Sequence, residues 1–195
     1  MKILLQKIVA NPRLEARWLN TLSLLEHMGA RKISKTVANT HPSLDVLKHH
    51  SDETRHAYIL KNLSKNLWKE NLDYLCREEG VAYFQNLDHQ ISEWVSKLTQ
   101  KENDFQNYLF VTCAIERRAM ALYPLYKSVT THPKVREELK NIILEEADHR
   151  QDIETQVAKT LAKIGVDDFS VCQKMEEVLF EKFTSSLRSF VLKNQ

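Results

Sequence analysis

Two short segments of this 195-residue chain contain the residue types of a metal site. Residues 52–56 read DETRH, and residues 145–149 read EEADH. In both segments a Glu precedes a His by three positions, and residues three apart on a helix lie on the same face. Each segment can therefore direct one carboxylate and one imidazole toward a common point.

Two further carboxylates complete a ligand set. Glu26 and Glu116 each lie roughly thirty residues before one of the two segments, in stretches with helical apolar spacing. Four carboxylates and two imidazoles are the ligands of dinuclear iron or manganese sites in helical bundles. We therefore predict two metal ions per chain, iron first and manganese or a mixed Fe/Mn pair as alternatives, with these ligands: Glu26, Glu53, His56, Glu116, Glu146 and His149.

Less specific interpretations of these residues stay open at this point. One Glu-x-x-His pattern is weak evidence, because it also occurs on solvated helix faces. Two occurrences, each preceded by a helical Glu, are much stronger evidence. For Glu26 and Glu116 taken singly, the alternative is a surface or hydrogen-bonded glutamate.

Two residues beside the predicted ligands also have two interpretations each. His49 lies one turn before Glu53 and could be an additional ligand or a proton relay, but we expect a surface histidine. Gly29 lies one turn after Glu26, and a glycine inside a helix costs about 1 kcal/mol relative to alanine. It either clears space for substrate or oxygen beside the metals or allows close helix packing.

Long helices are needed to position these residues. The chain has only 3 Gly and 4 Pro, which leaves few turn signals for a sheet and favours an all-α fold. The second helix is expected to run to about residue 76, with Gly80 as the break. Its largely apolar stripe consists of Leu44, Leu47, Ser51, Tyr58 and Leu63. Apolar spacing predicts helices over about 12–36, 44–76, 81–98, from Asn103 to the turn at 131–133, 134–164 and from Asp168 to about 192.

The two halves of this pattern look related. Each has a helical Glu, then a Thr-His-Pro turn, then a helix with Glu-x-x-His. Two such hairpins can pack into a four-helix bundle with all six ligands facing inward. We therefore predict a single domain over 1–195, with a metal-binding bundle over about 12–164 and an additional crossover helix over 81–98. The C-terminal helix over about 168–192 is expected to pack on the bundle or to form a homodimer face.

Charge and cysteine content argue against several classes of protein. The formal net charge is +2 and the longest basic cluster, residues 31–35, is short, so we expect neither a nucleic-acid nor a membrane partner. Three widely spaced Cys indicate reduced thiols in a cytoplasmic protein. The first ten residues are interrupted by Gln6 and Lys7, unlike an exported leader.

The first motif resembles a known signature. Residues 52–56 are similar to the Asp-Glu-x-Arg-His signature of bacterial multicomponent monooxygenase hydroxylases and acyl-carrier-protein desaturases. Both belong to the ferritin-like di-iron carboxylate superfamily. The resemblance implies that Glu53 bridges the metals and that His56 ligates one of them. It also implies that Asp52 hydrogen-bonds a ligand histidine and that Arg55 balances charge.

The second motif departs from that signature. Glu145 stands where the signature has Asp, and Asp148 stands where it has Arg. By the resemblance, Glu145 would then be the outer partner of a ligand histidine. The chain also lacks the paired Cys of full rubrerythrins, and its doubled motif is unlike the single motif of ferritins.

Three functions are compatible with these residues. The leading hypothesis is a di-iron oxidoreductase that activates dioxygen or peroxide to oxidise a small organic substrate, with electrons from an external donor. The second is peroxide scavenging or iron handling of the rubrerythrin or bacterioferritin type. The third is an interaction module that binds no metal or only a structural one. An apolar cavity that reaches the metals would favour the first.

Overall fold

Helices account for the secondary structure of this chain. The computed structural model describes residues 1–37, 41–70, 73–99, 104–166 and 169–193, and these residues form seven α-helices and no β-strand. The all-α prediction is therefore confirmed for this part of the chain. The helices are α1 (Lys2–Val9), α2 (Pro12–Val37), α3 (Leu44–Leu67), α4 (Arg77–Thr99), α5 (Asp104–Val129), α6 (Pro133–Ile164) and α7 (Ser170–Lys193).

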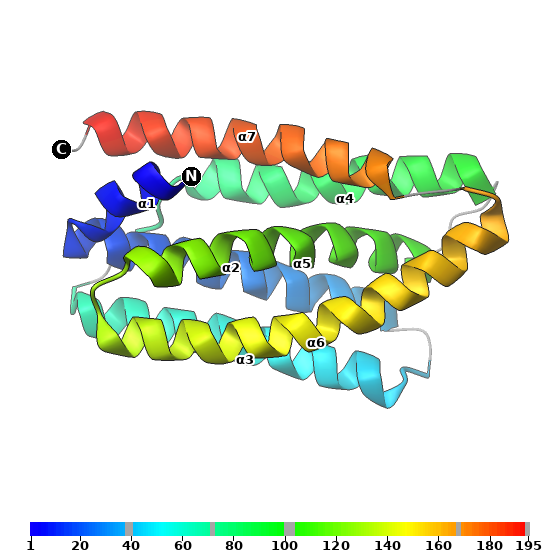
Figure 1. Ribbon diagram of the computed structural model, residues 1–195, viewed down its shortest axis with the longest axis horizontal. Coiled ribbons are helices and arrows are strands. Elements are labelled where there is room, and N and C mark those ends of the chain that lie inside the picture. Colours follow the sequence, from blue (N-terminus) through cyan, green and yellow to red (C-terminus); the bar gives the residue numbers. More distant parts are fainter. Residues whose placement is uncertain (38–40, 71–72, 100–103, 167–168, 194–195) are drawn as a thin grey trace.

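The long helices pack as a bundle in three layers of two (Figure 1). Helices α2 and α3 form one hairpin, and α5 and α6 form the other. In the middle layer α2 lies beside α5, while α3 and α6 form one outer layer and α4 and α7 the other. Short α1 packs on α2, α5 and α7, near the end where both termini lie. The two hairpins therefore pack side by side, and the α4/α7 layer covers the face formed by α2 and α5.

Local signals in the sequence explain several helix ends. Ser43 precedes α3, and its hydroxyl accepts a 3.3 Å hydrogen bond from the Val46 amide, as an N-cap should. Pro133 begins α6, where its missing N–H costs nothing. Gly165 ends α6 with a φ of 70°, a left-handed conformation that glycine adopts freely. The expected starts at Asn103 and Asp168 lie outside the described residues.

The predicted boundary at Gly80 is wrong. Helix α3 ends at Leu67, and Gly80 is a buried residue inside α4. The left-handed residue before α4 is Cys76, with a φ of 55°, and its carbonyl accepts the Gly80 amide at 3.0 Å. A cysteine takes up the left-handed conformation at position 76, so no glycine in the sequence marks the start of α4.

The predicted buried face of α3 is also largely wrong. Leu63 is buried as expected, but Leu44, Leu47 and Tyr58 are exposed, the last of them to 70%. The buried face instead carries His49 and two residues of the metal motif, Glu53 and His56. Leu60 and Leu63 continue the same helical spacing.

None of the described helices is both long enough and apolar enough to span a lipid bilayer.

Candidate metal centre

Among the described residues, seven buried or nearly buried side chains form two groups of metal-ligand atoms. In each group, one ligand atom of every member lies within 4.8 Å of one from each other member. The two groups adjoin, because His49 Nε2 lies 3.2 Å from Glu53 Oε1 and 3.2 Å from Glu116 Oε1. The first group is Glu26, Glu53, His56 and Glu146, and the second is His49, Glu116 and His149.

The structure brings all six predicted ligands to one place. Helices α2 and α5 supply one glutamate each, and α3 and α6 supply one Glu-x-x-His pair each. The i, i+3 spacing explains why both members of each pair face inward. The four helices are those of the two hairpins, as the doubled motif predicts.

The two motifs hold each other's histidine in place. His149 Nε2 lies 2.9 Å from Asp52 Oδ2, and His56 Nε2 lies 2.7 Å from Glu145 Oε2. Arg55 donates to both acids, at 2.5 Å to Asp52 and 2.8 Å to Glu145. Glu145 therefore does for His56 what Asp52 does for His149, and one arginine serves both motifs.

These outer contacts orient the histidines toward the carboxylates. When Nε2–H donates to an outer acid, the other ring nitrogen, Nδ1, is left to bind a metal. Nδ1 of His56 and Nδ1 of His149 are buried and have no hydrogen bond to the described residues, although His56 Nδ1 lies 3.0 Å from Glu146 Oε1. Arg55 and the two histidines also lower the pKa of Asp52 and of Glu145 against the opposing effect of burial.

The four carboxylates are electrostatically frustrated without cations. Burial and neighbouring carboxylates raise the pKa of Glu26 and of Glu116 well above the usual value, and burial beside Glu53 raises that of Glu146. Burial acts on Glu53 as well, but its hydrogen bonds with His49 and Glu26 and the charges of His49 and His56 together outweigh burial and lower the pKa of Glu53. Two divalent cations would offset four such charges, so the donor set fits a metal pair.

Glu176, another buried glutamate, has hydrogen-bond donors at both of its carboxylate oxygens. Glu176 on α7 accepts two hydrogen bonds from Arg118, at 2.8 and 2.6 Å, and one from the Tyr83 hydroxyl at 2.8 Å. Glu116 is equally buried, at 1% exposure, yet neither of its oxygens accepts a hydrogen bond from the described residues. Glu116 has only the contact with His49 Nε2 at 3.2 Å, and its missing hydrogen bonds are consistent with a place for a metal.

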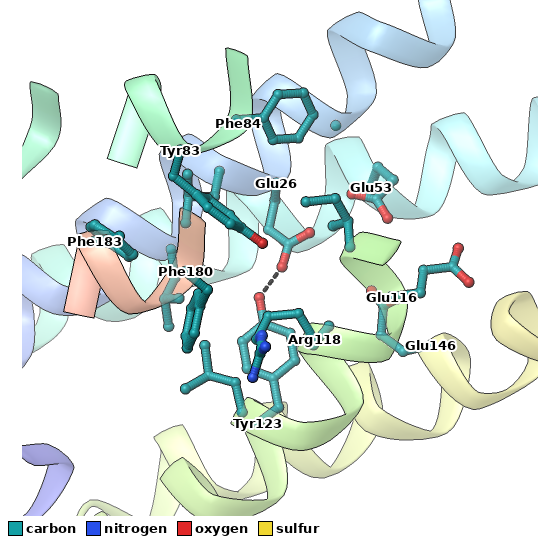
Figure 2. A pocket seen from close by; sticks show the side chains of 16 residues that line it. Glu26, Glu53, Tyr83, Phe84, Glu116, Arg118, Tyr123, Glu146, Phe180 and Phe183 are labelled. Atoms are coloured by element: carbon teal, nitrogen blue, oxygen red, sulfur yellow. Dashed lines mark hydrogen bonds between the residues drawn. The ribbon is translucent and has the colours of Figure 1, made fainter. Parts of the chain in front are cut away.

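A cavity of about 60 Å³ borders the carboxylates (Figure 2). All four ligand glutamates line one side of it, and Tyr123 donates a hydrogen bond to Glu26 at the same place. The remaining wall is mainly apolar and comes from α2, α4, α5 and α7. It includes Leu22, Leu25, Phe84, Leu122, Phe180 and Phe183.

Gly29 makes room for the Glu53 carboxylate. A Cβ atom at Gly29 would lie 2.9 Å from Glu53 Oε2, closer than carbon and oxygen pack. Neither predicted alternative included this contact, and Gly29 also lines the cavity beside the carboxylates, so space for substrate or oxygen there stays a prediction. The glycine on α2 thus lets the Glu53 carboxylate of α3 lie against the helix backbone.

The expectation that His49 lies on the surface is wrong. Its side chain is buried, with 5% exposure, and its Nδ1 lies 3.0 Å from the Tyr108 hydroxyl. The sequence did contain a signal, because His49, Glu53 and His56 follow the i, i+4, i+7 spacing of one helix face. Tyr108 has no comparable signal, since only packing brings α5 against this part of α3.

A comparison with protein-family models, curated proteins and solved structures finds no match to this chain. The helical bundle and its buried carboxylate and histidine groups are compatible with the ferritin-like superfamily that the motif resembles.

Proposed function

We propose that this chain is a ferritin-like, dinuclear metal oxidoreductase. It binds two iron ions, activates dioxygen or peroxide and oxidises a small organic substrate with electrons from an external donor. The observation that carries the proposal is the apolar cavity that ends on the four ligand carboxylates. Peroxide scavenging and iron handling need access to the metals but no apolar wall, so the cavity favours an oxidase or oxygenase.

The residues of this site would hold the two metals in the following way. Glu26 and His56 would hold one metal, and Glu116 and His149 would hold the other. Glu53 and Glu146 would be available as further carboxylate ligands. The bound metals supply the redox chemistry, and the protein supplies orientation and exclusion of water.

The outer residues fix the ligands. Asp52 and Glu145 accept the Nε2–H of the two histidines and so leave Nδ1 free for metal. The Tyr123 hydroxyl holds its proton against a Glu26 oxygen at the edge of the cavity. That contact restrains the carboxylate nearest the substrate space.

The cavity wall favours a small, uncharged, largely apolar substrate. Arg118 is the one basic side chain that lines the cavity among the described residues, and its Nε and Nη2 both donate to the carboxylate of Glu176, which balances its charge. The described wall of the cavity therefore has no unpaired positive charge that could bind an anionic substrate. The aromatic side chains on the wall suit flat or short aliphatic groups.

One experiment tests the proposal directly. The metal-free protein is loaded anaerobically with Fe(II), analysed for iron, and exposed to oxygen while the optical spectrum is recorded. We expect two irons per chain, a spectral change on oxygen exposure, and oxidation of a small apolar probe such as toluene or indole. Well under one iron per chain would overturn the metal centre and leave the interaction module.

The same preparation separates the oxidase from the alternative. Consumption of peroxide with no effect of any apolar probe would favour scavenging. A mass measurement showing a large hollow shell would favour iron handling. Either outcome would contradict substrate oxidation while leaving the two-metal site intact.

A further inference from the structure

The carboxylates are faced by three imidazoles, whereas the duplicated motif predicts two. His49 belongs to the same ligand group as Glu116 and His149, and its ring centroid lies 4.6 Å from that of His149. Without His49 this group would contain one carboxylate and one imidazole. The other group has four members, so the third imidazole makes the two positions more nearly equal in donor number.

His49 has the same arrangement as the two motif histidines. One of its ring nitrogens, Nδ1, is held by an oxygen outside the cluster, the Tyr108 hydroxyl at 3.0 Å. The other, Nε2, is directed at two carboxylates, 3.2 Å from an oxygen of Glu53 and 3.2 Å from one of Glu116. A nitrogen lone pair facing two carboxylates is repelled by them unless a proton or a metal lies between.

The third imidazole has no counterpart in the second half of the chain. The residue four positions before Glu53 is His49, whereas the residue four positions before Glu146 is Ile142, which is fully buried. The asymmetry is thus encoded at one position of an otherwise repeated motif. It gives the two metal positions different donor sets, with one imidazole beside Glu26 and two beside Glu116.

We infer that His49 is a seventh ligand, bound through Nε2 to the metal that Glu116 and His149 hold. The Tyr108 oxygen accepts the Nδ1–H and so sets the tautomer that leaves Nε2 free for metal. This inference rests on the proposed two-metal centre. It makes Tyr108 a positioning residue, which acts on the metal only through His49.

Metal binding by two variants tests the ligand. Metal-free protein is titrated with Fe(II) under anaerobic conditions, using His49→Ala and, as a matched control, His50→Ala. His50 is the next residue on α3 and belongs to neither ligand group. We expect wild type and His50→Ala to bind two irons per chain. His49→Ala should bind one tightly and the second at least about tenfold more weakly.

Retention of both sites in His49→Ala, with affinities within about threefold of wild type, would overturn the assignment. His49 would then be a buried hydrogen-bonded residue only. Wild type that binds no iron would overturn the proposed function together with the inference. The two failures are therefore distinguishable in one series.

A second measurement counts ligating histidines in wild type, so it does not depend on whether His49→Ala folds. Wild type is loaded with Co(II), and the paramagnetically shifted proton signals that disappear in D₂O are counted. Each ligating histidine contributes one such signal, from the N–H on its other nitrogen. We expect three signals, and Tyr108→Phe should shift one of them and leave two in place. Two signals in wild type with both metals bound would overturn the assignment of His49 alone.

Discussion

Asp52 and Glu145 occupy the same position in the two motifs and each holds the histidine of the other motif. The exchange explains how the second motif functions without the Asp and Arg of the signature it resembles. Glu has one more methylene than Asp, and it reaches His56 while also accepting from Arg55. The Arg55 guanidinium joins both acids, so a second arginine at position 148 is unnecessary.

Gly29 provides a prediction at the scale of one residue. Gly29→Ala should stabilise the metal-free protein by up to about 1 kcal/mol, because alanine is the better helix former and a flexible carboxylate can move away. The same displacement moves Glu53 from its place in the ligand group. Iron binding should therefore weaken at least tenfold, measured by anaerobic Fe(II) titration beside chemical denaturation of the metal-free form.

Gly80→Ala is the matched control for this substitution. A Cβ there would meet Phe183 at 3.5 Å, an ordinary contact, and its three nearest atoms belong to Phe183 and Leu25, neither of which is a predicted ligand. It should add helix stability without changing iron affinity. Equal iron affinity in Gly29→Ala and Gly80→Ala would mean that the contact with Glu53 has no role in the site.

At the scale of elements, the α4/α7 layer provides one wall of the cavity beside the predicted ligands. Phe84 of α4 and Phe180 and Phe183 of α7 form part of the cavity wall (Figure 2). The ion pair between Glu176 of α7 and Arg118 of α5 fastens this layer to the hairpin beneath it. Helix α7 thus contributes no predicted ligand and still shapes the space beside the predicted metal site.

Filling the cavity should separate substrate oxidation from metal chemistry. Ala119 lines the cavity, whereas Ala121, on the same helix, is exposed. Ala119→Leu adds volume beside the carboxylates, so we expect oxidation of the apolar probe to fall at least about tenfold while two irons still bind and react with oxygen. Ala121→Leu should behave like wild type in all three assays. Unchanged probe oxidation in Ala119→Leu would show that the substrate binds elsewhere.

At the scale of the whole molecule, the buried site should make the metal-free fold depend on pH. Burial lowers the pKa of His56, but the Glu146 and Glu53 carboxylates outweigh this and raise it to about 9, from an ordinary 6.5. A raised histidine pKa stabilises the fold fully below pH 6.5, and that stability is lost as the pH rises through 9. The raised pKa values of Glu26 and Glu116 act in the same direction, because the unfolded chain ionises these groups first.

We therefore expect the free energy of unfolding of the metal-free protein to fall between pH 7 and 8.5, by on the order of 2 kcal/mol. His149, Asp52 and Glu145 have lowered pKa values and titrate below this range, so they do not oppose the trend. In protein loaded with Mn(II) the ligands are already deprotonated, and the dependence should largely vanish. Thermal melts of both forms at several pH values measure this, and parallel curves would contradict it.

The all-α class and the convergence of six ligand side chains could be predicted from the residues alone. Sparse glycine and proline favour helices, and the three-residue spacing of Glu53 with His56, and of Glu146 with His149, places each pair on one face whatever the surrounding packing. The duplication then predicts two hairpins that meet. These are local properties of a helix, so the order of residues along the chain is sufficient.

The rotation of each helix about its axis was decided by packing. Apolar spacing on α3 favours burying Leu44, Leu47 and Tyr58, but the fold buries the polar face with His49 instead and leaves those three exposed. The contact of Tyr108 with His49, the exchanged acids and the cavity under α7 all depend on which faces of distant helices meet. Such choices follow from the summed contacts of the whole bundle, and no spacing within one segment encodes them.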